Sequence, residues 1–270
     1  MKAKIVDTTL RDGEQRAGIA LGLREKVKIA AILDDMGVDQ IEAGTPAMKG
    51  EEKKSIQKIM ELGLKSRISA WNRMNIYDIQ HSTECGVHII HITVPSSDIQ
   101  IKSKMNKDRG WIIDNLKRCV NYAVEKGFEV TVGMEDASRA DFKFLMCIAA
   151  NAFIEGASRV RYADTVGILH MSRAFREIRD IKSQLNICLE IHNHNDLGMA
   201  VANSVSAVRA GVEYVDCTIG GIGERAGNCN YIHFIKAARV CLDMYKDIDV
   251  EGMIEKQNDI ISIIKGKRIS

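Results

Sequence analysis

Short apolar runs alternate with longer segments of helical periodicity along almost the whole chain. Each run is rich in β-branched and other apolar residues, which is typical of parallel strands that are buried on both faces. The predicted strands are Lys4–Thr8, Gln40–Ala43, Ser66–Ala70, Ile89–Val94, Glu129–Gly133, Arg159–Tyr162, Ile187–Ile191 and Tyr214–Thr218. The pattern therefore predicts an α/β protein built on a parallel sheet.

Helical segments fill the intervals between these strands. The clearest are Arg24–Met36, Lys53–Leu62, Asp108–Glu125, Asp141–Glu155, Ser172–Gln184 and Tyr231–Met244. Several helical segments end at a glycine that precedes the next strand, and a glycine suits the left-handed conformation that closes a helix. These glycines are Gly37, Gly63, Gly86, Gly127, Gly156 and Gly211.

The strand–helix unit recurs roughly every 30 residues, which predicts a closed (β/α)8 TIM barrel. An open doubly wound sheet fits less well, because it usually has fewer strands and no GxGxxG motif follows the first strand here. We expect a single barrel domain over residues 1–248 and a short helical tail over 249–270. The chain has only 2 prolines and no linker-like segment, which also favours one domain.

Composition narrows the class of protein. Apolar residues make up 46% of the chain, the formal net charge is +2, and no basic tract occurs, so we expect neither nucleic acid nor a membrane as a partner. No signal-like segment and no run of about 20 apolar residues is found. The 7 cysteines are scattered without a CxxC pair, and most have apolar neighbours. We therefore expect buried, reduced thiols in a cytoplasmic protein.

Polar residues follow the predicted strands at the end where a barrel carries its active site. His192 and His194 are two positions apart, so on a strand both imidazoles face the same side. Asp12 follows the first strand and could add a carboxylate, and Asn228 in the loop after the eighth strand could add an amide oxygen. This mixed set suits Mg²⁺ or Mn²⁺, with Zn²⁺ as a further option. The alternative is a pair of structural histidines, but the Asn-Asp that follows them favours the metal.

Two further features at the carboxyl ends of the predicted strands could have either a catalytic or a purely structural role. Arg11 could neutralise an oxyanion on a metal-bound carbonyl, or simply form an ion pair at the barrel rim. The glycine-rich loop after the eighth strand could be an ordinary turn or a mobile lid. We predict a lid that includes Gly221, Gly223, Glu224 and Arg225.

The chain resembles the 2-isopropylmalate/homocitrate synthases, a family of metal-dependent barrel enzymes. The resemblance covers roughly residues 4–245. It rests on Asp7-Thr8-Thr9-Leu10-Arg11-Asp12-Gly13-Glu14-Gln15, on His192-x-His194-Asn195-Asp196 and on Gly223-Glu224-Arg225-Ala226-Gly227-Asn228. The resemblance implies metal ligation by Asp12, His192, His194 and Asn228. It also implies that Arg11 polarises the keto group of a 2-oxo acid, with Glu135 and Thr165 close to that substrate.

The resemblance implies condensation of acetyl-CoA with the 2-oxo acid, followed by hydrolysis of the thioester. Segments around Trp71, Glu135 and Thr165 look most like the homocitrate synthases of nitrogen fixers, which use 2-oxoglutarate. We predict Gln15, Arg73 and Arg139 as substrate-binding residues, the arginines for the second carboxylate. Alternatives are a 2-isopropylmalate, citramalate or Re-type citrate synthase, or a non-catalytic barrel that binds a 2-oxo acid.

Full-length members of this family continue into a subdomain with a His-Glu-Ala-Gly-x-His segment, which supplies a catalytic histidine to the neighbouring protomer. This sequence has no such segment. The other histidines, His81, His88, His91, His170 and His233, do not match it and are interpreted as surface or packing residues. We therefore expect the barrel subunit of a split enzyme, with the 249–270 tail as the remnant of a linker. The expected assembly is a homodimer, a hetero-oligomer with a separate C-terminal subunit, or both.

Overall fold

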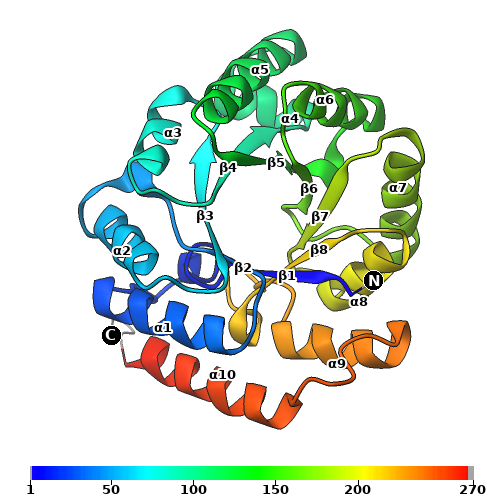
Figure 1. The fold of residues 1–270 in the computed structure, drawn as a ribbon. Coiled ribbons are helices and arrows are strands. Elements are labelled where there is room, and N and C mark those ends of the chain that lie inside the picture. The colour runs from blue at the N-terminus through cyan, green and yellow to red at the C-terminus, as the bar shows by residue number, and fades with distance from the viewer. Residues whose placement is uncertain (1, 267–270) are drawn as a thin grey trace.

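The computed structural model describes residues 2–266 of the chain. Eight parallel strands form a closed barrel, in which β8 pairs with β1 (Figure 1). The strands are β1 Lys4–Asp7, β2 Gln40–Glu42, β3 Arg67–Arg73, β4 Ile89–Pro95, β5 Glu129–Glu135, β6 Arg159–Asp164, β7 Cys188–Asn193 and β8 Tyr214–Cys217. The predicted TIM barrel is confirmed.

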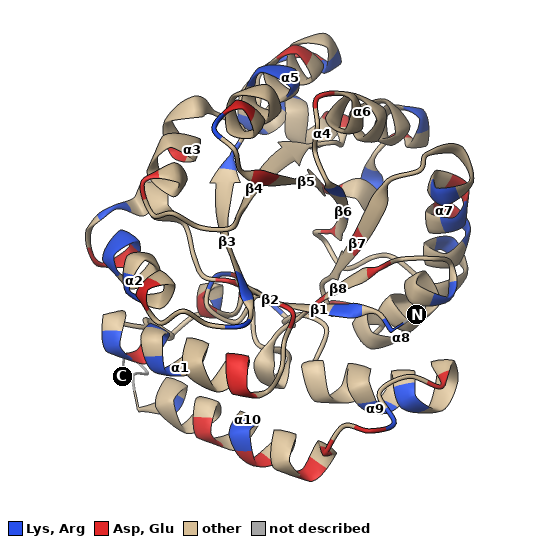
Figure 2. Cartoon of the chain, viewed as in Figure 1, with Lys and Arg blue, Asp and Glu red and all other residues tan. Residues whose placement is uncertain are grey.

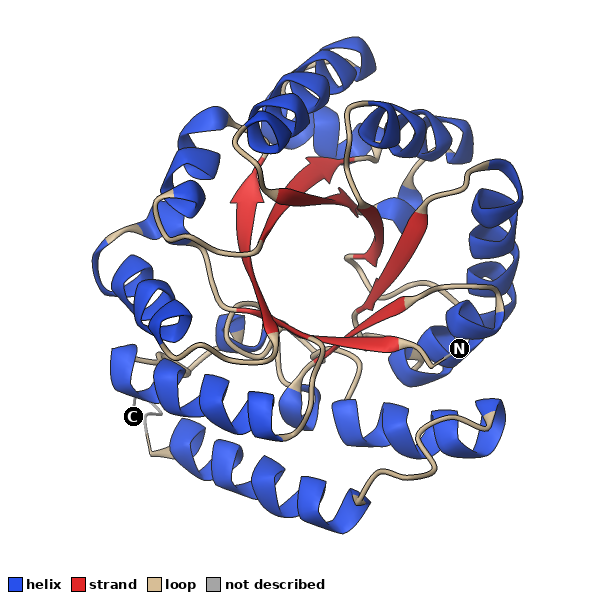
Figure 3. Cartoon of the chain, in the orientation of Figure 1, coloured by secondary structure: helices blue, strands red, loops and turns tan. Residues whose placement is uncertain are grey.

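A ring of helices surrounds the strands (Figure 3). They are α1 Leu23–Asp35, α2 Gly50–Glu61, α3 Ile76–Thr83, α5 Arg109–Glu125, α6 Phe142–Ile154, α7 Met171–Gln184, α8 Ala200–Arg209 and α9 Tyr231–Leu242. Helix α10, Val250–Lys265, lies outside this ring along α1 and α9 (Figure 1). Lysines and arginines are interspersed with acidic residues on the outer helices (Figure 2).

Five strands run further than the sequence pattern predicts, β4 by a single residue to Pro95 and four others by more. The predicted ends lie where polar residues begin, but β3 continues to Arg73, β5 to Glu135, β6 to Asp164 and β7 to Asn193. In the barrel these polar residues still pair in register, as Asp164 does with Asn193. Polar side chains at the last strand positions are stable there because they face a polar cavity or pair with rim residues.

Two short helical segments after β4 were not predicted from the sequence. Helix α4, Asp98–Gln100, begins at Ser97, whose hydroxyl accepts a hydrogen bond from the Gln100 amide. A single π-turn, η3 Ile101–Met105, follows and ends at Asn106 in the left-handed conformation. This segment brings Lys104 over the end of β5, where its ammonium pairs with Glu135.

Charged side chains occupy part of the interior of the barrel, where they form ion pairs between strands. Arg159 donates to Gln40 Oε1 at 2.6 Å and lies 3.0 Å from Glu190 Oε2. One layer higher, Arg161 pairs with Glu42 and Glu190. The arginines are at positions i and i+2 of β6, so both face inward.

Helix α10 is joined to the barrel by apolar and ionic contacts. Met253, Ile260 and Ile264 are buried, and Lys256 Nζ lies 2.6 Å from Asp35 Oδ2 on α1. The predicted division of the chain at residue 248 and the origin of the tail as a linker remnant stay predictions. Among residues 2–266, none of the helices combines the length and apolar content that a bilayer crossing requires.

Only some of the cysteines are buried as the sequence predicts. All seven are free thiols. The predicted burial is correct for Cys85, Cys119, Cys217 and Cys229. It is wrong for Cys147 and Cys241, which lie on exposed positions of α6 and α9, because an apolar neighbour in sequence is not a neighbour across a helix surface.

Candidate active site

The loop after β1 is folded back tightly on itself. The carbonyl of Thr8 accepts hydrogen bonds from the amides of Arg11, Asp12 and Gly13 at 2.8–3.1 Å. The Thr9 hydroxyl accepts a further bond from the amide of Ile219, at 2.9 Å, and so ties this loop to the one after β8. These contacts hold Asp12 at the seam between the first and last strands of the barrel.

Asp12, His192 and His194 form a buried cluster that could hold a metal ion, with one ligand atom from each within 4.8 Å of the others. Nε2 of His192 lies 3.2 Å from Asp12 Oδ2 and 3.2 Å from Nε2 of His194. His192 is on β7, whereas His194 follows the strand and forms an isolated bridge with Asn228. The structure thus brings together all four predicted ligands, since Asn228 Nδ2 also donates to Asp12 Oδ1 at 3.1 Å.

The charges of this cluster favour a cation. Burial alone would raise the pKa of Asp12, but the Arg11 guanidinium and His192 hold it far below its usual range. Burial alone would lower the pKa of His192, but hydrogen bonds to Asp12 and Asp216 raise it to about 9. Burial and the charge of His192 lower the pKa of His194 to about 4. Two carboxylates around two imidazoles therefore create a position that attracts positive charge.

Unpaired polar atoms support the same interpretation. The side-chain oxygen Oδ1 of Asn228 is buried and has no hydrogen-bond partner among the described residues. His192 donates through Nδ1 to Asp216 at 2.9 Å, so its Nε2 faces Asp12 and His194 and would bind an ion in exchange for its proton. A histidine ligand oriented by a carboxylate is the usual arrangement around protein-bound metals. The donor set of carboxylate, two imidazoles and amide oxygen fits a divalent ion.

A ring of buried ionic contacts links the metal-binding cluster to the rest of the barrel. Arg11 lies 2.9 Å from Asp12 through Nη1 and 2.6 Å from Glu42 through Nε. Glu42 then contacts Arg161 at 2.8 Å, and Arg161 Nε lies 3.1 Å from Asp216 Oδ2. Because Asp216 also orients a histidine of the cluster, the position of Arg11 is coupled to that of the proposed ligands.

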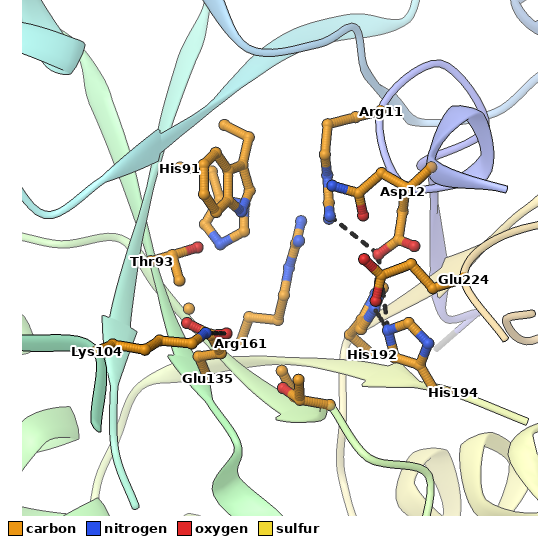
Figure 4. Close-up of a pocket in the computed structure, with 15 residues that line it drawn as sticks. Arg11, Asp12, His91, Thr93, Lys104, Glu135, Arg161, His192, His194 and Glu224 are labelled. Atoms are coloured by element: carbon orange, nitrogen blue, oxygen red, sulfur yellow. Dashed lines mark hydrogen bonds and ion pairs between the residues drawn. The ribbon is translucent and has the colours of Figure 1, made fainter. Parts of the chain in front are cut away.

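A cavity of about 270 Å³ opens beside this cluster at the carboxyl ends of the strands (Figure 4). Its lining residues are Arg11, Asp12, Gln15, Trp71, His91, Thr93, Lys104, Gly133, Glu135, Arg161, Ala163, Thr165, His192, His194 and Glu224. Trp71 stacks near the guanidinium of Arg11, whose carbon is 5.9 Å from the ring centroid. The cavity is small and most of its lining residues are polar or charged, which suits a short, charged substrate.

Three other predicted residues also line the cavity. Glu135 pairs with Lys104 at its mouth. Thr165 accepts a hydrogen bond through Oγ1 from the amide of Asp136, at 2.8 Å, so its hydroxyl is fixed. Gln15 is an exposed lining residue at the end of η1, Gly13–Gln15.

Two predicted substrate-binding residues do not reach the cavity. The guanidinium of Arg73 is held by the buried carboxylate of Asp78 on α3, at 2.7 and 2.9 Å, and its side chain is 65% exposed. Arg139, on η4 Ala137–Arg139, forks onto Asp136 three residues earlier, at 2.8–3.0 Å. The geometry thus argues against both arginines as the cation for a second carboxylate, because nearby carboxylates capture them.

The predicted lid is the segment from Gly221 to Arg225, and the structure holds it closed against the barrel. Arg225 forks onto Asp196 at 2.7 and 2.9 Å and donates to the carbonyl of Thr165 at 2.8 Å. Gly223 lies over the cluster, where a Cβ would be only 2.1 Å from Asn228 Nδ2. Glu224 lines the cavity, and lid motion stays a prediction.

Several cavity residues were not predicted from the sequence. His91 was interpreted as a surface or packing residue, but it lines the cavity and donates from Nδ1 to Glu42 at 2.7 Å. Burial and the nearby Arg161 lower the pKa of His91 to about 4. Thr93 and Arg161 line the cavity as well, and Lys104 does so from the unpredicted η3. The alternation of Arg159 and Arg161 within a strand was the available signal for inward-facing charge.

The family model described as HMGL-like matches residues 2–260. The chain is 54% identical to the homocitrate synthase subunit alpha of Clostridium pasteurianum, over 98% of this chain and 99% of that protein. It is 45% identical to 2-isopropylmalate synthase 2 of Caldanaerobacter subterraneus, over 93% of this chain. The chain spans 65% of the length of that second protein.

Solved structures support the fold alone. The HMG-CoA lyase of Brucella melitensis superposes with a TM-score of 0.85, covering 99% of each chain at 16% sequence identity. At this low identity the similarity shows a shared barrel rather than a shared substrate.

Proposed function

The chain belongs to the HMGL-like family, and on that basis we propose that it is a homocitrate synthase subunit that condenses acetyl-CoA with 2-oxoglutarate. The observation that carries this proposal is the buried group of Asp12, His192 and His194 beside the Arg11 guanidinium in one cavity. The identity of 54% to a homocitrate synthase subunit, over nearly all of both chains, supports the choice of product.

Asp12, His192, His194 and Asn228 would hold a divalent ion, with Mg²⁺ or Mn²⁺ favoured by the mixed oxygen and nitrogen donors. When bound, such an ion supplies Lewis-acid chemistry and fixes the orientation of a chelating 2-oxo acid. Asp216 holds His192 in the tautomer that presents Nε2 to this position.

The surrounding side chains bind and orient the substrates. Condensation forms a bond between the acetyl methyl carbon and the keto carbon, while the methyl loses a proton and the keto oxygen gains one. Arg11, fixed by Glu42 and Asp12, is placed to stabilise negative charge that develops on the keto oxygen. Thr165 and Glu135 are the proposed contacts to the 2-oxo acid. Water then cleaves the thioester and releases CoA and the tricarboxylic acid.

We also propose that a second polypeptide completes the enzyme. The support is the relative of matching length, whose name describes one subunit of a homocitrate synthase. Exposed apolar side chains at the same rim, including Met48, Ile99, Leu197 and Met199, give that polypeptide a surface to cover. That polypeptide would supply the catalytic histidine that the family resemblance implies.

A thiol-release assay tests the proposal. The chain, with Mn²⁺ and a candidate second subunit, is expected to release CoA from acetyl-CoA in the presence of 2-oxoglutarate. If no 2-oxo acid supports CoA release, the proposal that the chain is a condensing enzyme is wrong. Normal turnover by the chain alone would remove the need for a partner, whereas faster turnover with 2-oxoisovalerate would point to 2-isopropylmalate synthesis.

A further inference from the structure

The cavity has two chemically different ends. The proposed metal ligands lie on the side of β1 and β7, whereas His91 and Thr93 lie on the opposite wall, with Arg161 between them (Figure 4). A 2-oxo acid bound by its carboxylate and keto oxygen at the first end would direct its remaining chain toward the second. The lining of the second end therefore determines which 2-oxo acid fits.

Arg161 supplies positive charge at this second end. Its side chain is almost fully buried, yet it contributes to the cavity lining. Hydrogen bonds to Glu190 and Glu42 use three of the five N–H groups of the guanidinium. The remaining N–H groups are available to a ligand that enters the cavity. An alkyl group in the same place would leave them unpaired.

The wall beside Arg161 is polar and shaped by a glycine. Nε2 of His91 is buried without a hydrogen-bond partner in the described residues, because Nδ1 is the atom that bonds Glu42. It lies over Gly133, where a Cβ would be only 2.3 Å from Nε2. Any side chain at residue 133 would therefore push the imidazole aside. The Thr93 side chain is one strand position beyond Ile92, on the same face as His91.

The span between the two ends suits a short diacid. One oxygen atom, Asp216 Oδ2, contacts both Arg161 Nε and His192 Nδ1, at 3.1 and 2.9 Å. Arg161 Nε and His192 Nδ1 are thus no more than two hydrogen-bond lengths apart. The five-carbon chain of 2-oxoglutarate can bridge such a distance.

We propose that Arg161, Thr93 and the space above Gly133 form a specificity-determining subsite for the second carboxylate of a 2-oxo diacid. The guanidinium and the threonine hydroxyl donate to that carboxylate, and His91 closes the wall behind it. This inference rests on the proposed function, because it assumes that the first carboxylate is bound at the metal-binding end. It assigns to β4–β6 the role that sequence analysis gave to Arg73 and Arg139.

Isothermal titration of the Mn²⁺-loaded chain tests the subsite with two probes, 2-oxoglutarate and the monoacid 2-oxoisovalerate. The wild-type protein is expected to bind the diacid at least about tenfold more tightly. Thr93→Val, which keeps the shape and removes the hydroxyl, and Gly133→Ala are each expected to weaken diacid binding about tenfold. Arg161→Lys, which keeps one charge, should also weaken diacid binding, but Arg161 contacts Asp216 as well, so monoacid binding is expected to change less than twofold only in Thr93→Val and Gly133→Ala.

Matched substitutions outside the cavity serve as controls. Thr83→Val on α3 and Gly110→Ala on α5 change the same residue types at positions that do not line the cavity. Both are expected to bind the two probes as the wild-type protein does. Thermal melts of every variant confirm folding, and Thr93→Val keeps the test decisive if Arg161→Lys fails to fold.

The outcomes separate the two proposals. Equal weakening of diacid and monoacid binding by Thr93→Val and Gly133→Ala would overturn the subsite and leave the proposed enzyme intact. Tighter wild-type binding of 2-oxoisovalerate would overturn the subsite and the choice of 2-oxoglutarate, while metal-dependent binding of a 2-oxo acid would stand. Binding of neither probe would overturn both proposals.

Discussion

The carboxylate of Asp216 accepts a hydrogen bond from Nδ1 of His192 at 2.9 Å and so orients that ring toward Asp12. We predict that Asp216→Asn lowers Mn²⁺ affinity about ten- to hundredfold, because the ring loses its charged partner. Titration with Mn²⁺ measures the effect, with Asp114→Asn at an exposed position of α5 as the control. Unchanged affinity in Asp216→Asn would show that this carboxylate does not support the site.

Arg11 contacts two carboxylates through two different nitrogens, which the single ammonium nitrogen of a lysine cannot do. Nε contacts Glu42 and Nη1 contacts Asp12, so the fork of the guanidinium fixes its own position. We predict that Arg11→Lys reduces kcat about a hundredfold or more while Mn²⁺ affinity changes little. Arg24→Lys, at an exposed position of α1, is the control in the thiol-release assay. A normal kcat in Arg11→Lys would exclude the oxyanion role.

The backbone conformation just before Asn228 requires a glycine at position 227. Gly227 has φ 86°, and a Cβ there would lie 2.0 Å from the carbonyl oxygen of Gly221. We predict that Gly227→Ala displaces Asn228 and weakens Mn²⁺ binding about tenfold or more. Gly198→Ala is the matched control, because Gly198 also has a positive φ, 71°, but nothing lies within 4 Å of its Cβ position. Equal effects in the two variants would attribute the loss to backbone strain alone.

Asp7 should make stability depend on pH. Its burial raises the pKa of the carboxyl from 3.8 to about 7, although hydrogen bonding by Thr9 opposes this. The folded state therefore binds the proton more tightly than the unfolded state, and stability falls as pH rises from about 4 through 7. In Asp7→Asn this fall disappears. The variant should gain stability relative to wild type, on the order of 3 kcal/mol, between pH 4 and pH 8.

Urea unfolding of both proteins at pH 4.5, 6 and 8 measures this difference. Asp114→Asn again provides the control, since an exposed carboxyl has no burial penalty to remove. A constant difference between Asp7→Asn and the wild-type protein across the three pH values would show that Asp7 is ionised throughout.

The fold and the metal-binding cluster could be predicted from the sequence for the same reason. Polar residues follow each predicted strand, and the closure of the barrel brings the ends of β1, β7 and β8 together. The structure departs from the predicted placement of substrate-binding residues where side chains choose between competing partners. Alternation puts Arg73 on the same face as Trp71, yet the buried Asp78 of the next helix captures it. No local pattern reveals that competition.

The cavity wall was missed for a related reason. β6 is buried on both faces, so the alternation of Arg159 and Arg161 indicates inward-facing charge but does not tell a buried ion pair from a cavity-lining residue. Its role depends on Glu42 and Glu190, which come from strands distant in sequence. His91 was interpreted as a surface or packing residue because it does not match the family's histidine segment. Only the missing side chain of Gly133 makes room for its ring in the cavity wall.

The proposed ligands lie on both sides of the seam where the barrel closes, and Asn228 is 216 residues from Asp12 along the chain. During synthesis, Asp12 is made long before Asn228, so the complete set of proposed ligands forms only after most of the chain has been synthesised. A bound ion would link the loop after β1 to β7 and to the loop after β8, and it would slow the separation of β1 from β8. Metal occupancy should thus lengthen the kinetic lifetime of the closed barrel against proteases.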